Sequence, residues 1–373
     1  MSEAEKAEKK TGWRWGVNRW LILLVFIAGL LATKRFIPAR PAIFLPAEAL
    51  LGTADHPLFY IFGNPFYLTN TMVATILADI FLLIVVFFFV APSYRKGNLQ
   101  VPKGIAGVFE GLSEVFYNLT SSTAGKWTKT IFPWFAAISM LVLIMNWMEL
   151  IPSVDAWGQF NLEHYVAGQV DFDIHDTAHL TAEQTAIVHE LEEEYYTICD
   201  VKEFSFLGAE WSAISVNADH KDVGTGECGH AIVPFVRAVA TDLNFTIALA
   251  LVSVFMIQVV GVRALGLSYF EKFFNVRTLF SKPAFGLIDF VVGLFEIVSE
   301  FSKIISFSFR LFGNIFAGAV LLFVLGTLIP VGAQAAVLAL EFMVGMIQAV
   351  VFGMLTMIFM SQATHSHFDE EHH

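Results

Sequence analysis

The chain has 373 residues, of which 56% are hydrophobic and only 15% are charged. Soluble domains carry about 25% charged residues, so this composition excludes soluble enzymes and disordered tails and indicates a membrane protein. The net charge of −12 comes from one segment, because residues 153–233 hold 16 of the 34 acidic residues and two basic ones, a charge of −14. The rest of the chain carries +2 by difference.

Apolar runs long enough to cross a bilayer core of ~30 Å occupy residues 70–91, 130–152 and 242–262. A shorter run at 20–33 follows a basic stretch, and its length fits either a membrane anchor or the core of a signal peptide. Both alternatives place residues 38–69 outside the cytoplasm, so the topology downstream does not depend on the choice.

The C-terminal part holds two longer apolar runs, 285–329 and 331–363, separated by Pro330. As one helix, the first would be ~68 Å long at 1.5 Å per residue, about twice the bilayer core. It must therefore tilt steeply or break. Together the two runs predict a helical hairpin.

Basic residues in the short loops predict the orientation. The loops at 92–129 and 263–282 should face the cytoplasm, because they hold Arg95, Lys96, Lys103, Lys126, Lys129, Arg263, Lys272, Arg277 and Lys282. The acidic insert then lies outside, and the His-rich tail lies inside.

The first basic loop also contains an amphipathic stripe with the spacing of a helix that lies on the membrane surface. Its apolar members are Ile105, Val108, Phe109, Leu112, Val115, Phe116 and Leu119. We expect this helix not to span the membrane.

A polar stripe interrupts the apolar run at 285–329, where a charge costs ~2.5–3.5 kcal/mol on insertion scales. Its members fall on one helical face: Asp289, Glu296, Glu300, Lys303, Arg310 and Asn314. In the simplest interpretation Lys303 pairs with Glu300 or Glu296 and the charges only hold helices together.

Arg310 does not fit that interpretation, because its helix neighbours at 306, 307, 313 and 314 include no carboxylate. Glu341, or a carboxylate on another protein, would be its partner.

Small residues follow Arg310 at Gly313, Ala317, Gly318 and Ala319, where another helix can approach closely. On the next run, Glu341, Gly345 and Gln348 repeat at i, i+4 and i+7. This spacing places an intramembrane carboxylate and an amide on one face. Glu341 is therefore a candidate proton carrier.

The segment SFSFRLFGNIFAGA at 306–319 resembles the signature of subunit a of F-type ATP synthases. Four further segments are similar to that family: IMNWMELIP ending at Pro152, TDLNFTIALAL from Thr241, LFEIVSEFSK at 294–303, and EFMVGMIQAVVFGML at 341–355. The resemblance covers roughly residues 70–152 and 234–363. The N-terminal part and the acidic insert lie outside it.

The resemblance implies a long tilted hairpin against a rotating ring of c subunits, with Arg310 facing the carboxylates of the ring. It also implies two offset half-channels. The outer one would pass Asn314, Glu341 and Gln348, with Asp242 and Asn244 nearer its entrance, and the inner one would pass Glu296, Ser299, Ser302 and Ser306. Many bacterial relatives have a Glu and a His where this chain has Ala319 and Glu341, so a role of that Glu–His pair does not transfer.

The resemblance further implies peripheral stalk b subunits and other ATP synthase subunits as partners, in contact with membrane lipid and without nucleic acid. No cofactor is expected, and the chain has no GxxxxGK[ST] nucleotide loop, so ATP chemistry would take place on other subunits. The main alternative is a self-contained proton-coupled transporter. A zinc or intramembrane hydrolase is disfavoured, because there is no HExxH motif. We expect a bacterial inner membrane, and proton versus sodium stays open.

Cys199 and Cys228 both lie in the insert, where an oxidising exterior would permit a disulfide; two free thiols are the alternative. His175 and His179 could bind a metal if helical, but we favour a solvated acidic cap and expect no metal site.

The sequence thus predicts an all-α polytopic membrane protein of five or six membrane helices with a tilted C-terminal hairpin, one interfacial helix and a large acidic extracytoplasmic insert. Its expected parts are 1–69 (anchor or signal segment and outer loop), 70–152 (first core helices), 153–233 (insert), 234–363 (core helices with the half-channels) and 364–373 (polar tail).

Overall fold

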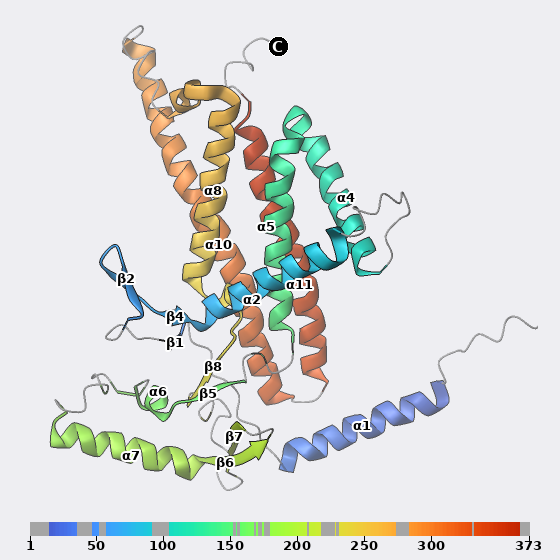
Figure 1. Ribbon diagram of the computed structural model, residues 1–373, viewed down its shortest axis with the longest axis vertical. Coiled ribbons are helices and arrows are strands. Elements are labelled where there is room, and N and C mark those ends of the chain that lie inside the picture. Colours follow the sequence, from blue (N-terminus) through green and yellow to red (C-terminus); the bar gives the residue numbers. More distant parts are fainter. Residues whose placement is uncertain are drawn as a thin grey trace, which may run out of the picture. The chain divides into compact units, whose positions relative to one another are not determined.

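The computed structural model describes residues 15–35, 47–51, 57–91, 104–151, 154, 157–167, 169–170, 174, 180–206, 209–217, 228, 231–273, 283–329 and 332–365. Most of them are helical (Figure 1). The helices are α1 (Trp15–Arg35), α2 (Asn70–Ile84) with a π-helical continuation η2 (Val85–Val90), α4 (Ile105–Ala124), α5 (Thr128–Glu149), α6 (Leu162–Ala167), α7 (Ala182–Ile198), α8 (Leu243–Leu265), α10 (Pro283–Leu328) and α11 (Ala333–Gln362). Short 3-10 segments are η3 (Gly125–Trp127), η5 (Val239–Thr241) and η6 (Gly266–Lys272).

Five stretches of helix are long and apolar enough to cross a membrane, as searched in the described part of the chain. They are Asn70–Phe88, Gly107–Glu149, Leu243–Leu265, Phe290–Gly326 and Ala333–Gln362. The three spans predicted at 70–91, 130–152 and 242–262 are thereby confirmed as long apolar helices. The chain is a multi-pass, predominantly helical membrane protein.

The first apolar run also forms a helix, α1, whose most apolar part is the shorter stretch Arg19–Leu31. The length of this apolar stretch fits both a membrane anchor and the core of a signal peptide, so both alternatives stay predictions.

The long helix α10 is unbroken over 46 residues, which corresponds to ~69 Å at 1.5 Å per residue. Of the two outcomes expected for this run, tilt or break, the break is therefore excluded. Helices α10 and α11 pack antiparallel. The Phe307 ring lies 5.2 Å from that of Phe352 and 5.8 Å from that of Phe359, while Asn314, later on α10, bonds to Gln348, earlier on α11. The two helices form the predicted hairpin, and its tilt stays a prediction.

One buried cluster holds α10 and α11 against α5 and α8. Its fully buried members include Val142 of α5, Ala250 of α8, Phe307 and Leu311 of α10, and Phe352 of α11. Burial of apolar area stabilises such a core by about 25 cal/mol per Å² in water, but between membrane helices close packing contributes most. This cluster packs the hairpin of α10 and α11 against α5 and α8.

The helix α4 turns into α5 at Gly125, whose φ of +50° is a left-handed conformation that favours glycine. Phe116 of α4 is buried, and its ring lies 4.8 Å from that of Phe135 on α5. Val108 and Val115 of the same stripe are exposed. The predicted amphipathic stripe is therefore divided, one part packing on protein and the other facing outward. A position on the membrane surface stays a prediction.

The insert has a small core of its own. Helix α7 begins with a capping box between Thr181 and Gln184, which satisfies backbone donors at the helix start. It is followed by an antiparallel hairpin of β6 (Cys199–Phe206) and β7 (Ala209–Val216). Two further short strands, β5 (Gly158–Phe160) and β8 (Ile232–Pro234), form another pair. The sequence did not predict these strands.

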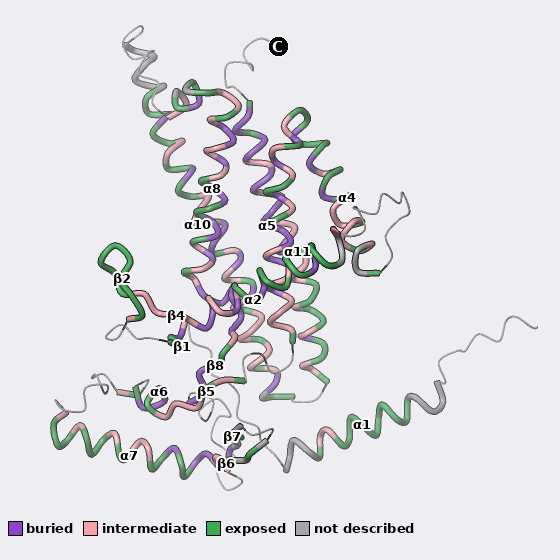
Figure 2. The backbone as a smooth tube through the Cα atoms, viewed as in Figure 1, coloured by how far each residue is buried: buried purple, intermediate pink, exposed green. Residues whose placement is uncertain are grey.

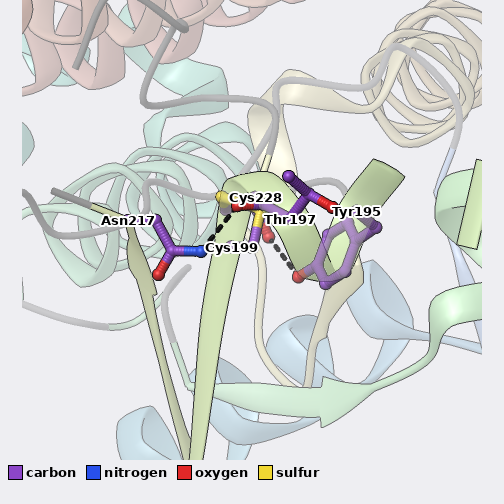
Figure 3. The surroundings of a disulfide bond; sticks show 5 residues. All are labelled: Tyr195, Thr197, Cys199, Asn217 and Cys228. Atoms are coloured by element: carbon purple, nitrogen blue, oxygen red, sulfur yellow. Dashed lines mark hydrogen bonds between the residues drawn. A yellow bond between two sulfur atoms is a disulfide. The ribbon is translucent and has the colours of Figure 1, made fainter. Parts of the chain in front are cut away.

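Cys199 and Cys228 form a disulfide, with their α-carbons 5.7 Å apart (Figure 3). The bridge is buried beside Tyr195, whose hydroxyl donates a hydrogen bond to the carbonyl of Cys228 at 3.1 Å. Asn217 donates to the carbonyl of Thr197 at 2.6 Å. The disulfide alternative is thus confirmed, and the bridge joins the end of α7 to the last part of the insert.

Ahead of α2, two short antiparallel pairs precede the first core helix. The outer strands β1 (Ala49–Leu51) and β4 (Leu68–Thr69) pair with each other. Between them β2 (Phe59–Ile61) and β3 (Asn64–Phe66) form a hairpin. The Thr69 side chain caps α2 by accepting from the backbone of Met72, so the paired segment leads directly into the helix.

Candidate functional site: polar residues of the C-terminal hairpin

Arg310 lies in the middle of α10 and is half-buried. Its Nη2 donates to Ser306 Oγ one turn earlier, at 3.3 Å. Within the described part of the chain Arg310 forms no ion pair with a carboxylate, whereas Lys272 and Lys303 both do. The predicted pairing of Arg310 with Glu341 is therefore not seen. Arg310 is thus a permanent cation on an apolar helix without a carboxylate partner among the described residues.

Asn314 and Gln348 join the two helices of the hairpin. Asn314 Nδ2 donates to Gln348 Oε1 at 2.8 Å, and Gln348 is only 3% exposed. Its Nε2 is buried and has no hydrogen-bond partner among the described residues.

Glu341 faces α10 at Gly318. Its carboxylate occupies the space that a Cβ at Gly318 would need, so the glycine makes room for the acid. One turn further along α11, Asn146 of α5 donates to the carbonyl of Gly345 at 3.2 Å. Glu341, Gly345 and Gln348 thus lie on one face, as the spacing predicted, with α10 and α5 against it.

Glu296 and Glu300, nearer the start of α10 than Arg310, both lie in ion pairs. Glu300 is buried, and its Oε1 accepts from Lys303 at 2.9 Å and from Lys272 at 3.2 Å, while Lys272 also lies 3.5 Å from Glu296. Lys272 belongs to η6 and rests over the Tyr269 ring at 4.3 Å. The predicted pairing of Glu300 with Lys303 is therefore confirmed. For Glu296 the partner is Lys272 instead of Lys303.

The three serines of the predicted inner path are exposed on α10. They are Ser299, Ser302 and Ser306. Ser302 donates to the carbonyl of Val298, and Ser306 accepts from Arg310. Asp289 lies on α10, but its side chain is outside the described residues.

Asp242 and Asn244 stand at the start of α8, away from the hairpin polar groups in sequence. Asp242 is buried and caps the helix by accepting from the backbone of Asn244 at 2.9 Å. Its other oxygen accepts from Thr71 Oγ1 at 3.0 Å. The neighbouring Asn70 donates to Glu48 at 2.9 Å, and both residues are buried.

Sequence reasoning missed Glu48, Asn70, Thr71 and Lys272 as neighbours of the predicted site residues. Polar residues at the head of an apolar run were a signal for Asn70 and Thr71. No signal singled out Glu48, because it lies in an irregular segment that only the fold brings to α2. In the described residues no group of three His, Cys, Asp or Glu side chains could hold a metal; His175 and His179 lie outside them.

A family model described as ATP synthase A chain matches residues 72–361. ATP synthase subunit a of Helicobacter pylori (strain Shi470) is 34% identical to the chain over 132 residues, which cover 35% of this chain and 55% of the relative. ATP synthase subunit a 1 of Hahella chejuensis (strain KCTC 2396) is 35% identical over 136 residues, covering 35% of this chain and 51% of the relative. The aligned part thus spans about half the length of these curated relatives.

Proposed function

Because this chain belongs to the ATP synthase A chain family, we propose that it is the proton-conducting stator subunit of the membrane sector of an F-type ATP synthase. It would act against a ring of c subunits, beside peripheral stalk b subunits and the other subunits of the complex. We place it in a bacterial inner membrane, with the acidic insert outside and the C-terminus in the cytoplasm. The nucleotide chemistry would belong to other subunits.

The observation that carries the proposal is Arg310, half-buried on an apolar helix and without a carboxylate partner among the described residues. An unneutralised charge within a membrane span is costly and marks an ion pathway. On the same helix the side chains of Phe309 and Ile305 are exposed, about 100° and 140° around the helix axis from Arg310. This is a surface that an apolar partner carrying carboxylates would complete.

In the mechanism we propose, Arg310 is an electrostatic gate. Its guanidinium stays protonated and cannot relay protons itself. It would favour the ionised carboxylate of the ring subunit that faces it and would block direct proton passage between the two half-channels. Each proton would then travel with the ring, and each crossing supplies ~2.3 kcal/mol per 100 mV.

The outer half-channel would use Glu341, Asn314 and Gln348. Two observations support this role. The carboxylate of Glu341 on α11 lies beside Gly318 of α10, and Gln348 has a buried amide donor. Asp242 and Asn244 would lie nearer the entrance, where the hydrogen bond from Thr71 extends the polar group toward α2.

The inner half-channel would pass Glu296, Ser299, Ser302 and Ser306. Glu296 is partly exposed and lies 3.5 Å from Lys272, and the serines are exposed. Glu300, by contrast, is held by two lysines. We therefore assign Glu296 to the path and Glu300 to the structure around it.

Proton uptake into liposomes under an imposed potential tests the proposal. The full chain, reconstituted with and without its c-ring, is compared with Arg310→Ala and Glu341→Gln. Uptake should require the ring, coupled turnover should disappear in Arg310→Ala, and flux should slow in Glu341→Gln. Arg263→Ala is the matched control, because Arg263 is exposed in the last turn of α8.

Two results would count against the proposal. If the chain conducts protons without the ring, the self-contained transporter becomes the better function. If Arg310→Ala retains coupled pumping, the gate is wrong.

A further inference from the structure

The hairpin formed by β2 and β3 has an unusual turn. Phe59 pairs with Phe66, Tyr60 with Pro65 and Ile61 with Asn64, which leaves Phe62 and Gly63 as the two-residue loop. Both have positive φ, +50° and +85°. Turns of this kind favour Asn-Gly or Gly-Gly, and Phe62 is the only non-glycine residue with positive φ in the described part of the chain. A bulky aromatic at such a position calls for a function.

The hairpin is apolar on both faces. Phe62 is fully exposed at the tip, Tyr60 is 67% exposed, and Leu58 and Phe59 are about half exposed. The tube of this loop is drawn as exposed all around its tip (Figure 2). Alternate residues of a strand point to opposite faces, so neither face of this hairpin is a polar face directed to water.

The hairpin cannot bury these side chains by itself. Within the hairpin, the rings of Phe59 and Phe66 stack 4.4 Å apart, but an isolated two-stranded hairpin is at best marginally stable in water. An apolar environment outside this segment must therefore cover the tip.

The neighbouring sequence indicates what that environment is. Residues 57–78 carry no Asp, Glu, Lys, Arg or His, so the segment offers nothing to a charged protein surface. Helix α2 begins at Asn70, four residues after the end of β3, and its side chains at Ile76, Leu77 and Ile80 are exposed. At ~3.3 Å per residue, Phe62 lies within about 26 Å of the start of this membrane span.

We propose that the β2–β3 hairpin is a membrane anchor, with the Phe62 tip inserted at the boundary between lipid headgroups and acyl chains on the side where α2 begins. The occupant of its apolar surface is lipid. Aromatic side chains are enriched at that boundary, and Tyr60 provides a ring with a polar hydroxyl beside Phe62. The anchor would fix the entry of the chain into α2, independently of proton transport.

The test places a fluorescent probe on the hairpin of the full chain in membrane vesicles from producing cells. The two native cysteines form the disulfide, so under non-reducing conditions a maleimide derivative of the dye NBD reacts with one new thiol. Phe62→Cys and Tyr60→Cys are labelled separately, because Tyr60→Cys keeps the turn residue. Quenching by nitroxide lipids reports lipid contact, and quenching by aqueous iodide reports water.

Matched controls bracket the result. Phe81→Cys on the exposed face of α2 reports a lipid-facing position, and Ser212→Cys on β7 of the insert reports a water-facing one. We expect the hairpin probes to be quenched several-fold more by shallow nitroxide lipids than the Ser212 probe is, and several-fold less by iodide. In a Phe62→Asn background, which suits the turn but removes the apolar ring, iodide quenching at position 60 should rise at least twofold.

Two outcomes overturn the anchor. Strong iodide quenching at both hairpin positions, equal to that at 212, means that the tip lies in water. Protection from both quenchers means that protein covers it, either a second copy of this chain or another subunit. Because the readout involves no proton flux, neither outcome depends on the proposed function.

Discussion

The carboxylate of Glu341 on α11 lies against the α-carbon of Gly318 on α10, in the space that any larger side chain at 318 would occupy. The atom in the way is the end of a flexible side chain and not backbone. A substitution at Gly318 would therefore move the acid and leave the helices in place. The glycine positions Glu341 for the outer half-channel that we propose.

Gly318→Ala should slow proton uptake several-fold while the thermal stability of the chain changes by less than about 1 kcal/mol, because the Glu341 side chain can swing aside. Ring-dependent uptake in liposomes and a thermal unfolding curve in detergent measure the two effects. Gly313→Ala is the control, since nothing lies within 4 Å of a Cβ at that position. Equal uptake in both variants would show that the placement of Glu341 is unimportant.

Glu300→Gln should destabilise the protein by about 3 kcal/mol, because Lys272 and Lys303 would then share a buried site without their carboxylate. Glu296→Gln should cost less than about 1 kcal/mol, since that side chain is 32% exposed and its contact is longer. Thermal unfolding of both variants in the same detergent checks the order.

The two substitutions also separate structure from transport. Proton uptake should fall in Glu296→Gln although its stability is retained. A stable Glu296→Gln chain with normal uptake would remove Glu296 from the inner path.

Loss of the Cys199–Cys228 bridge should loosen the insert. The two residues are 29 positions apart, and closing a loop of that size contributes about 3–4 kcal/mol in the chain-entropy account. The double variant Cys199→Ser, Cys228→Ser should be cut by protease within the insert at least tenfold faster than the native chain. Digestion of the membrane helices, followed in the same gel, provides the internal control. Equal cutting would mean that the small core around Tyr195 suffices.

The insert should lose stability in alkali through Tyr195. Burial, followed by the neighbouring hydroxyls of Tyr196 and Tyr165, raises the pKa of Tyr195 above its ordinary value of 10.0. Because the folded pKa lies above the unfolded one, this contribution is complete below about pH 10 and is lost as pH rises through the folded pKa. Protease resistance of the insert, measured from about pH 9 to 11.5, should fall.

The Tyr195→Phe variant isolates that group. It should show a shallower decline above about pH 10, whereas Tyr196→Phe, at an exposed position, should decline much as the native insert does. A Tyr195→Phe chain with the native slope would assign the alkaline loss to other groups.

The contacts of Glu300 show which interactions could be predicted from the sequence and which could not. Glu300 and Lys303 are three residues apart on a helix, so their pairing follows from local geometry and was within reach. Lys272 is 28 residues from Glu300, and no helical periodicity relates the two positions, so the contact of Lys272 with both acids could not be predicted. Glu48 was missed for the same reason.

The sequence alone determined the features that depend on short-range physics: the apolar runs long enough to span a bilayer, the acidic character of the insert, and the faces on which Arg310, Asn314, Glu341 and Gln348 lie. Helical periodicity and hydrophobic length act within a few turns, so they can be read residue by residue. Only the tertiary structure decided that α10 is unbroken and that Cys199 and Cys228 form a disulfide. It also decided that both Lys272 and Lys303 pair with Glu300, and that the carboxylate of Glu341 packs against Gly318. These outcomes depend on which distant segments pack together, and close packing selects one arrangement among many that the same local patterns allow.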